Sequence, residues 1–165
     1  MSIDRFRSRL RPPGLLYVDV YPYHLSPSGE LEFLLLKRRG DIVLPNVWQP
    51  VSGKIKEGEK FGEAFIRQAA QKTGRRPLRV FALDTVNTYF DAYYDTVMLV
   101  PSAACRLFDK TVALDADLHV EFRWVDLARF EAIVKFDHQR ETARKISAIV
   151  LEQPGRGHYS EIPVS

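Results

Sequence analysis

The stretch GKIKEGEKFGEAFIRQAAQKTG, residues 53–74, decides how this chain folds. Its first part is polar and carries two glycines, which is typical of a loop. From Phe61 onward the apolar residues recur at helical spacing, and one side of the helix carries Phe65, Ile66, Ala69 and Ala70. Gly74 follows as a helix stop. The pattern therefore predicts a loop and then a helix over residues 61–73.

Further strands and helices are predicted on both sides of this segment. Apolar, β-branched and aromatic runs predict strands at residues 15–21, 31–38, 78–88, 93–100 and 120–125. The first two form a hairpin through a turn at residues 22–30. A short helix is expected at 126–132 and a last helix at 137–152, whereas residues 41–52 and 53–60 are expected to be loops. Strands interrupted by one helix and closed by another are typical of a mixed α/β domain.

The composition indicates one globular domain. The chain has 165 residues, of which 45% are hydrophobic and 27% are charged, enough for a full-sized core. We expect residues 1–13 to form a flexible N-terminal arm, 14–152 the domain, and 153–165 a frayed C-terminal tail. The arm carries four arginines and no apolar stretch, unlike a secretory signal. The apolar runs are too short to span a bilayer.

Charge and cysteine content narrow the expected partners and compartment. The formal net charge of +3 and the pI near 9.0 favour an anionic small ligand. They fall short of the concentrated basic stripe of a nucleic-acid-binding protein. We therefore expect a phosphorylated small molecule or nucleotide as the partner, with no membrane and no specific nucleic acid. The single cysteine, Cys105, fits a cytoplasmic protein.

The central stretch resembles the box of the Nudix hydrolase family. That box reads Gly, five residues, Glu, seven residues, and then Arg-Glu-apolar-any-Glu-Glu-any-Gly-apolar. This sequence matches the box at Gly53, Glu59, Arg67, Ala69 and Gly74. The flanks agree as well, at residues 34–39, 48–53 and 119–124 and at Arg140. The resemblance therefore covers about residues 14–152.

The resemblance implies a Nudix-type α/β/α sandwich, with a mixed sheet, a central box helix and a C-terminal helix. The strings WQPVSG at residues 48–53 and HVEFRW at 119–124 look most like pyrophosphohydrolases of nucleoside triphosphates and of dihydroneopterin triphosphate. In such enzymes, carboxylates on one helical face collect Mg²⁺ or Mn²⁺ beside the diphosphate of the substrate. The resemblance also implies that Glu59 pairs with Arg67 and fixes the loop on the helix.

The sequence departs from the family at the metal-binding positions. The three box glutamates are replaced by Gln68, Gln71 and Lys72, so the catalytic set is not intact. A neutral amide is a weak ligand for a divalent cation, and an ammonium group repels one. A carboxylate before the late strand often joins this site in the family. Asp115 and Asp117 are the nearest substitutes here.

Three interpretations of the altered box stay open. In the first, residues 68, 71 and 72 form a solvated helix face, accessible and opposite Phe65 and Ala69, with no cofactor. In the second, the ammonium replaces the charge of the metal and binds a phosphate directly. The candidate ligand-binding residues are then Arg38, Arg39, Trp48, Lys54, Lys56 and Lys72. In the third, a working hydrolase holds Mg²⁺ or Mn²⁺ through Glu57, Glu59, Glu63 or Glu121.

An aromatic cluster offers a further function. Tyr89, Phe90, Tyr93 and Tyr94 surround a predicted hairpin turn, where they could line a ligand pocket, a homodimer interface or the contact surface of an interaction module. Replacement of Glu by Gln also leaves an engineered chain open. The sequence as a whole favours a weak or inactive hydrolase that binds a phosphorylated or nucleotide-like ligand, and His119 is expected to be structural.

Overall fold

A computed structural model of the chain describes residues 17–155 and 160–165. The first described elements form the predicted hairpin, in which β1 (Tyr17–Leu25) and β2 (Leu31–Arg38) pair antiparallel, with Tyr23 opposite Phe33. Gly29 turns the chain between them at a φ of 89°, a conformation that glycine adopts without strain. The expected arm at residues 1–13 lies outside the described residues.

The strands form one mixed sheet in the order β3-β2-β1-β6-β5-β8, with β4 paired to β1 and β7 paired to β2. The remaining strands are β3 (Trp48–Gln49), β4 (Val51–Lys54), β5 (Arg79–Asp91), β6 (Thr96–Arg106), β7 (His119–Val125) and β8 (Glu161–Ile162). β1 runs parallel to β6, and the other pairs are antiparallel. The central position of β1 places its residues beneath both helical layers.

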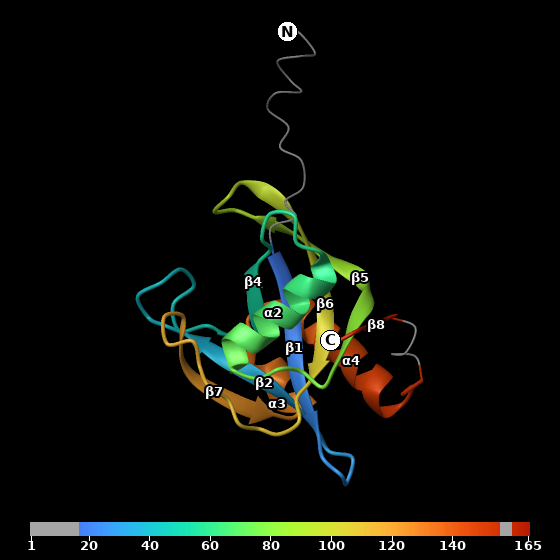
Figure 1. Cartoon of the computed structure of the whole chain (residues 1–165). Coiled ribbons are helices and arrows are strands. Elements are labelled where there is room, and N and C mark those ends of the chain that lie inside the picture. Colours follow the sequence, from blue (N-terminus) through green and yellow to red (C-terminus); the bar gives the residue numbers. More distant parts are fainter. Residues whose placement is uncertain (1–16, 156–159) are drawn as a thin grey trace, which may run out of the picture.

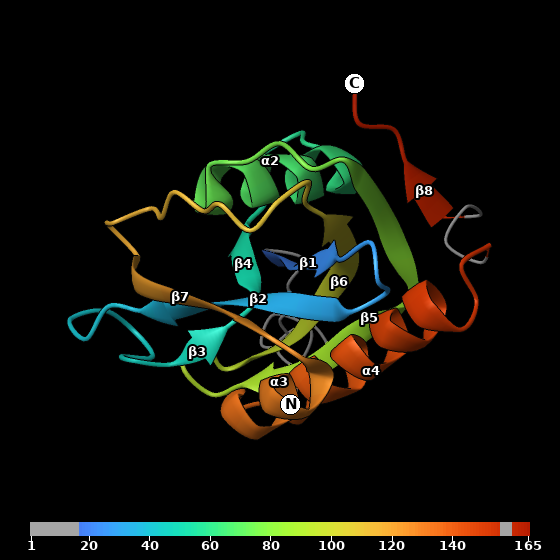
Figure 2. The same cartoon turned by 90° about the horizontal axis from the view of Figure 1, so that it is seen from below.

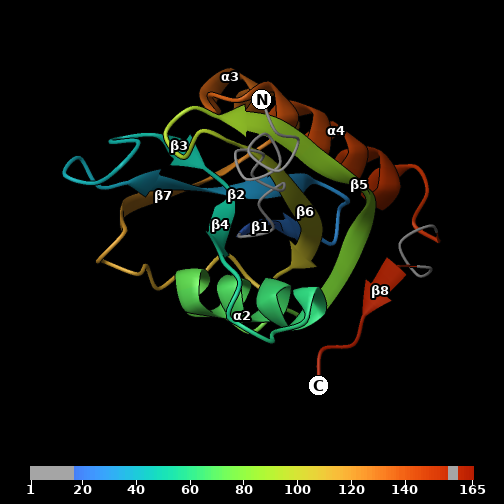
Figure 3. The same cartoon turned by 90° about the horizontal axis from the view of Figure 1, so that it is seen from above.

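The helices cover both faces of the sheet. α2 (Phe61–Thr73) lies on one face, and α3 (Leu127–Ile133) and α4 (Asp137–Leu151) lie on the other (Figures 2 and 3). Alternate residues of each strand point to opposite faces, so the molecule has two cores. Val18, Val20 and Leu36 pack beneath α2, whereas Tyr21 and Phe33 pack beneath α3 and α4. In the part of the chain that the structure describes, no helix is long and apolar enough to cross a membrane.

The box helix α2 has defined ends. The carboxylate of Glu63 accepts a hydrogen bond from the backbone N–H of Lys60 at 3.1 Å, which satisfies one of the free donors at the N-terminus. At the other end Gly74 adopts a φ of 67° and donates its N–H to the carbonyl of Ala70 at 2.9 Å. These caps fix which residues of α2 face the sheet.

The fold agrees with the sequence in class and differs in detail. The α/β/α sandwich, the hairpin and the helices at 61–73 and 137–151 are confirmed. β3 and β4 occupy parts of residues 41–54 that were predicted to be loops. β6 begins at Thr96 rather than residue 93, because the carboxylate of Asp91 accepts hydrogen bonds from two backbone N–H groups of the turn. Within the segment expected to fray, Glu161 and Ile162 form β8 against β5.

Candidate functional site

The loop that precedes α2 is held to the helix by Glu59 and Arg67. The guanidinium of Arg67 donates from Nε to Oε1 of Glu59 at 2.6 Å and from Nη2 to Oε2 at 2.8 Å. It also donates to the carbonyl of Lys54 at 2.9 Å. Hydrogen bonding to Arg67 lowers the pKa of Glu59 to about 2. The expected pair is confirmed, and it fixes the shape of the loop.

Gln68 packs directly on Gly53. The side chain of Gln68 is buried and donates from Nε2 to the carbonyl of Lys54 at 2.9 Å, while its Oε1 is buried without a hydrogen-bond partner. A β-carbon at residue 53 would lie 2.0–2.2 Å from the amide of Gln68. The glycine is therefore required by this close approach rather than by its backbone angles.

Lys72 forms an ion pair with Asp115. Its Nζ lies 3.3 Å from Oδ2 of Asp115, and the side chains are 10% and 30% exposed, respectively. The segment that carries Asp115 reaches α2 because the N–H of Ala113 donates to the carbonyl of Thr73 at 2.8 Å. A cation of the chain itself thus lies between the box helix and the carboxylate that precedes β7.

The prediction that Gln68, Gln71 and Lys72 share one accessible face opposite Phe65 was wrong. Gln68 and Lys72 are 4% and 8% exposed, and only Gln71 is exposed. Lys72 comes seven positions after Phe65, and at about 100° per residue it returns to nearly the same direction. Gln71 points outward, where its Oε1 accepts a hydrogen bond from Nη1 of Arg67 at 3.1 Å.

His119 lies beside this ion pair. It is 2% exposed, and neither ring nitrogen has a hydrogen-bond partner. Burial, together with the charges of Lys72 and Arg38, lowers the pKa of His119 to about 4, so the imidazole is neutral near pH 7. Arg38 lies opposite His119 in the β2–β7 register. We call Gln68, Lys72, Asp115, His119 and Arg38 the box-helix cluster.

The other basic and aromatic candidates are not gathered around Lys72. Arg39 is hydrogen-bonded to Asp41 at 2.9 and 2.5 Å. Trp48 packs with the core beneath α3 and α4, where Arg123 lies over its ring at 4.6 Å. Lys54, the last residue of β4, and Lys56, on the loop before α2, are both exposed. Of the six ligand-binding candidates, the structure brings only Lys72 and Arg38 together at His119.

The glutamates considered as replacement metal ligands are engaged elsewhere or exposed. Glu59 pairs with Arg67, and Glu63 caps α2. Glu121 pairs with Arg123 at 3.0 Å and with Lys37 at 3.7 Å, and Glu57 is exposed. Over residues 17–155 and 160–165, no group of three or more His, Cys, Asp or Glu side chains is placed to hold a metal ion.

A polar row crosses the other face of the sheet and was missed by the sequence analysis. Asp19 lies opposite Ser52 on β4 and opposite Ser102 on β6, so the three side chains point to the same face. Asn87 extends the row, since its Nδ2 donates to Ser102 Oγ at 3.2 Å and to Thr142 Oγ1 at 3.3 Å. The one sequence signal was an aspartate within an apolar strand.

Asp19 is the central and most buried charge of this polar row. It is 5% exposed, and burial raises its pKa to about 6 despite a hydrogen bond from Ser52. His138 on α4 approaches it, with Nε2 3.9 Å from Oδ2. The imidazole stacks on the rings of Tyr89 and Phe136, with centroid separations of 5.2 and 5.7 Å. The row thus combines hydrogen-bonding groups with flat rings.

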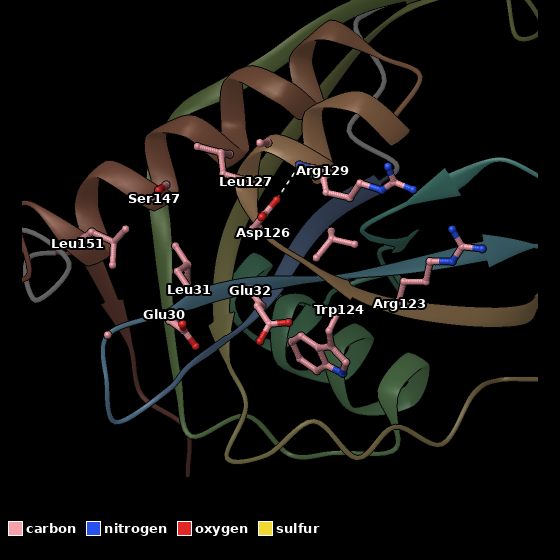
Figure 4. Close-up of a pocket in the computed structure, with 13 residues that line it drawn as sticks. Glu30, Leu31, Glu32, Arg123, Trp124, Asp126, Leu127, Arg129, Ser147 and Leu151 are labelled. Carbon is pink, nitrogen blue, oxygen red and sulfur yellow. Dashed lines mark hydrogen bonds between the residues drawn. The ribbon is translucent and has the colours of Figure 1, made fainter.

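An open groove of about 1000 Å³ lies between the β1–β2 turn, the end of β7 and the helices α3 and α4 (Figure 4). Its walls carry both charges, including Glu30, Glu32, Arg123 and Arg129. Asp126 lies in the groove and accepts a hydrogen bond from the backbone N–H of Arg129 at 2.8 Å. The groove contains no member of the box-helix cluster or of the polar row.

A loop and a capped helix on one face of a mixed sheet, joined by a Glu–Arg pair, define a Nudix-type fold. A family model of the NUDIX domain matches residues 21–148. The chain belongs to this family, as the resemblance of its box implied. The comparison with curated protein sequences gives no match.

Solved structures agree on the fold. The chain is similar to an Ap4A hydrolase from C. elegans, with 21% identity, a TM-score of 0.65, and coverage of 81% of this chain and 96% of that one. The chain is also similar to the Nudix domain of NrtR from Shewanella oneidensis, complexed with ADP ribose. The identity is 21%, the TM-score is 0.66, and the match covers 88% of this chain and 99% of that one. For the dihydroneopterin triphosphate pyrophosphohydrolase of E. coli, the identity is 18% and the TM-score is 0.65. The match covers 79% of this chain and 93% of that one. At these identities the likeness supports the α/β/α fold alone.

Proposed function

We propose that this chain is a Nudix domain that binds a phosphorylated, nucleotide-like compound at the box-helix cluster without hydrolysing it efficiently. The observation that carries the proposal is the ion pair of Lys72 and Asp115, with 3.3 Å between Nζ and Oδ2. In this arrangement an ammonium of the protein supplies the positive charge that a metal supplies in the family's enzymes. An ammonium attracts phosphate as a point charge.

The residues of the cluster do not suit a divalent cation. Mg²⁺ and Mn²⁺ prefer several carboxylate or other oxygen ligands. Here Asp115 is the one carboxylate of the cluster, and it is already paired with Lys72. Gln68 turns its Nε2 to a backbone carbonyl and offers a neutral amide. This set of residues therefore does not support hydrolysis through a bound divalent cation.

A phosphate at this site has to compete with Asp115 for the ammonium of Lys72. Asp115 is 30% exposed, so solvent reaches the pair and its separation costs less than for a fully buried pair. Lys54 at the end of β4 and Lys56 on the following loop are exposed and add to the positive field of this face. Binding should therefore be of moderate strength and should weaken as salt rises.

The polar row is not part of this site, because it lies on the face of the sheet beneath α4, whereas the box-helix cluster lies on the face beneath α2. Asp19 and Ser102 are also buried, at 5% and 1% exposed, which closes the row to a ligand. The nucleotide class is supported instead by similar structures. Two of the similar structures are an Ap4A hydrolase and a Nudix domain complexed with ADP ribose. Both names specify nucleotide compounds, which supports this class of ligand.

Calorimetric titration with ADP and ATP in EDTA tests the proposal. We expect binding without metal that weakens at high salt and weakens further in Lys72→Glu. Lys54→Glu is the matched control, because Lys54 is exposed at the end of β4 and this substitution should reduce binding less. Absence of binding at millimolar nucleotide, or binding indifferent to Lys72→Glu, would refute the proposal. Phosphate release from either nucleotide with Mg²⁺ or Mn²⁺ would instead indicate a working hydrolase.

A further inference from the structure

The outer edge of β5 lacks a neighbouring strand over most of its length. β8 pairs with Val80 and Phe81 only, and within the described residues no strand pairs with residues 82–91 on the side away from β6. This stretch reads ALDTVNTYFD and contains no Lys, Arg or Pro. Exposed edges are commonly protected by lysine or proline, because their free N–H and C=O groups can pair with another strand. Neither residue lies in this stretch itself. The strand is irregular between Ala82 and Val86, and Lys145 of α4 reaches Thr85 at 3.3 Å, so the regular open edge is Val86 to Asp91.

One face of the β5–β6 hairpin is apolar and exposed. Val86 and Phe90 are 51% and 63% exposed, and β6 places Pro101 and Val97 opposite them. Figure 1 shows the hairpin reaching beyond α2, which therefore does not cover this face at its tip. Tyr89 lies between these positions in the sequence, so its side chain points to the other face of the sheet, where it stacks on His138 of α4. An exposed apolar face beside an open edge favours association with another strand.

We propose that a second copy of this chain pairs with this edge, β5 against β5, in an antiparallel dimer with its two-fold axis at Thr88. A two-fold axis perpendicular to the sheet keeps each face on its own side, so residues opposite one another must share a face. Pairing centred on Thr88 puts Val86 of each copy opposite Phe90 of the other. Aromatic and β-branched residues form favourable cross-strand pairs.

The charges and the neighbouring registers single out this pairing. Centred on Thr88, the regular stretch Val86 to Phe90 pairs with itself. Asp91 then lies opposite Thr85, at the end of the irregular segment, so no two carboxylates face each other. A centre at Asn87 would leave Val86 opposite Thr88 and would set Phe90 opposite the irregular segment between Ala82 and Val86. A centre at Tyr89 would leave Phe90 opposite Thr88. Val86 and Phe90 are four residues apart, and Thr88 lies midway between them. Only a centre at Thr88 therefore forms two Val86–Phe90 pairs across the axis.

Charge substitution at the axis tests both the dimer and its register. Thr88 is exposed and would face itself across the axis, so Thr88→Lys sets two ammonium groups opposite each other and Thr88→Glu sets two carboxylates. By analytical ultracentrifugation we expect the unsubstituted chain to be dimeric at about 100 µM, as for a moderate interface. Each variant alone should be monomeric. An equimolar mixture of the two should again form dimers.

The mixture makes the test independent of any loss of folding, since misfolded variants would not restore each other. Thr111→Lys, also at an exposed threonine, is the control and should stay dimeric. A monomeric unsubstituted chain at this concentration would overturn the proposal. So would a dimer that persists in Thr88→Lys, or variants that remain monomeric when mixed. Nucleotide titration of the Thr88 variants keeps this result separate from the proposed ligand binding.

Discussion

Lys72 and Asp115 join the end of the box helix to the segment that precedes β7, through 3.3 Å between Nζ and Oδ2. If Asp115 competes with a phosphate for the ammonium, Asp115→Asn should tighten ADP binding in EDTA several-fold. The same change leaves Lys72 without its ionic partner and should lower the free energy of unfolding by about 1–2 kcal/mol, between the values for exposed and buried pairs. Calorimetry and denaturant unfolding measure the two effects.

Asp117→Asn is the control for that variant, because this carboxylate lies in the same segment and is exposed. It should leave both quantities nearly unchanged. Weaker ADP binding in Asp115→Asn would show that the carboxylate supports the ligand rather than competing with it.

Restoring the box should create a divalent-cation site. The triple variant Gln68→Glu, Gln71→Glu, Lys72→Glu removes the ammonium and adds three carboxylates on the helix. Together with Asp115, which is unchanged, the variant carries four carboxylates in this region. We expect the triple variant to bind Mn²⁺ in calorimetric titration and the unsubstituted chain to bind it far more weakly. Lys72→Glu alone should bind less than the triple variant. Equal Mn²⁺ binding by the original chain would contradict the assignment of Lys72 as the resident cation.

The Glu59–Arg67 pair should contribute stability that depends on pH. The pKa of Glu59 is about 2 in the folded chain, below the ordinary 4.5. Its contribution is therefore present above pH 4.5 and is lost as pH falls from 4.5 toward 2. Glu59→Gln should lower the free energy of unfolding by about 2 kcal/mol at pH 7. The difference from the unsubstituted chain should shrink on acidification. A constant difference down to pH 3 would count against the pair.

Asp19 should have the opposite dependence. Its pKa rises from 3.8 to about 6 on folding, so the folded chain loses stability as pH increases from 4 to 6. Asp19→Asn removes this loss and should stabilise the chain above pH 6 by about 3 kcal/mol, with little gain at pH 4. Thermal melts across this range, compared with His138→Asn as a neighbouring control, measure the effect. A destabilised Asp19→Asn at pH 7.5 would refute it.

The contact of Gly53 with Gln68 predicts a coupled pair of substitutions. In Gly53→Ala the new methyl group would displace the amide of Gln68, which loses its 2.9 Å hydrogen bond to the carbonyl of Lys54. We expect a loss of about 1–2 kcal/mol in the free energy of unfolding. Gln68→Ala removes the obstructing side chain, so adding Gly53→Ala to it should cost much less. Additive losses in the double variant would argue against the close approach.

Much of the fold could be predicted because its signals are local. The helix over residues 61–73 follows from one apolar stripe and a glycine stop, and the resemblance of the box to the Nudix family implied the pairing of Glu59 and Arg67. β3 and β4 escaped prediction because two and four residues around Pro50 carry too little alternation to be recognised as strands. The sequence at Glu161–Ile162 did not predict a strand either. Two residues carry no alternation pattern, and they are recognised as a strand only by their pairing with β5.

The site could be predicted only in part, because its main contacts are distant in sequence. Lys72 and Asp115 are 43 positions apart and meet through the packing of the helix end on the segment before β7. The polar row depends on the register of neighbouring strands, which places Asp19 beside Ser52 and Ser102. From the sequence, Asp19 was an isolated polar residue in an apolar strand. Its neighbours became apparent only once the strands were paired.

The hydrogen bond from Trp124 Nε1 to the carbonyl of Lys110, at 3.0 Å, gives the chain its own optical reporter. Lys110 lies in the same connection between β6 and β7 as Asp115. Displacement of this connection would exchange a fixed carbonyl partner of the indole for water. The chain has two tryptophans, and the other, Trp48, is stacked beneath Arg123. With Trp48 replaced by Phe, the emission of the remaining indole would follow the opening of the Asp115 segment without any attached dye.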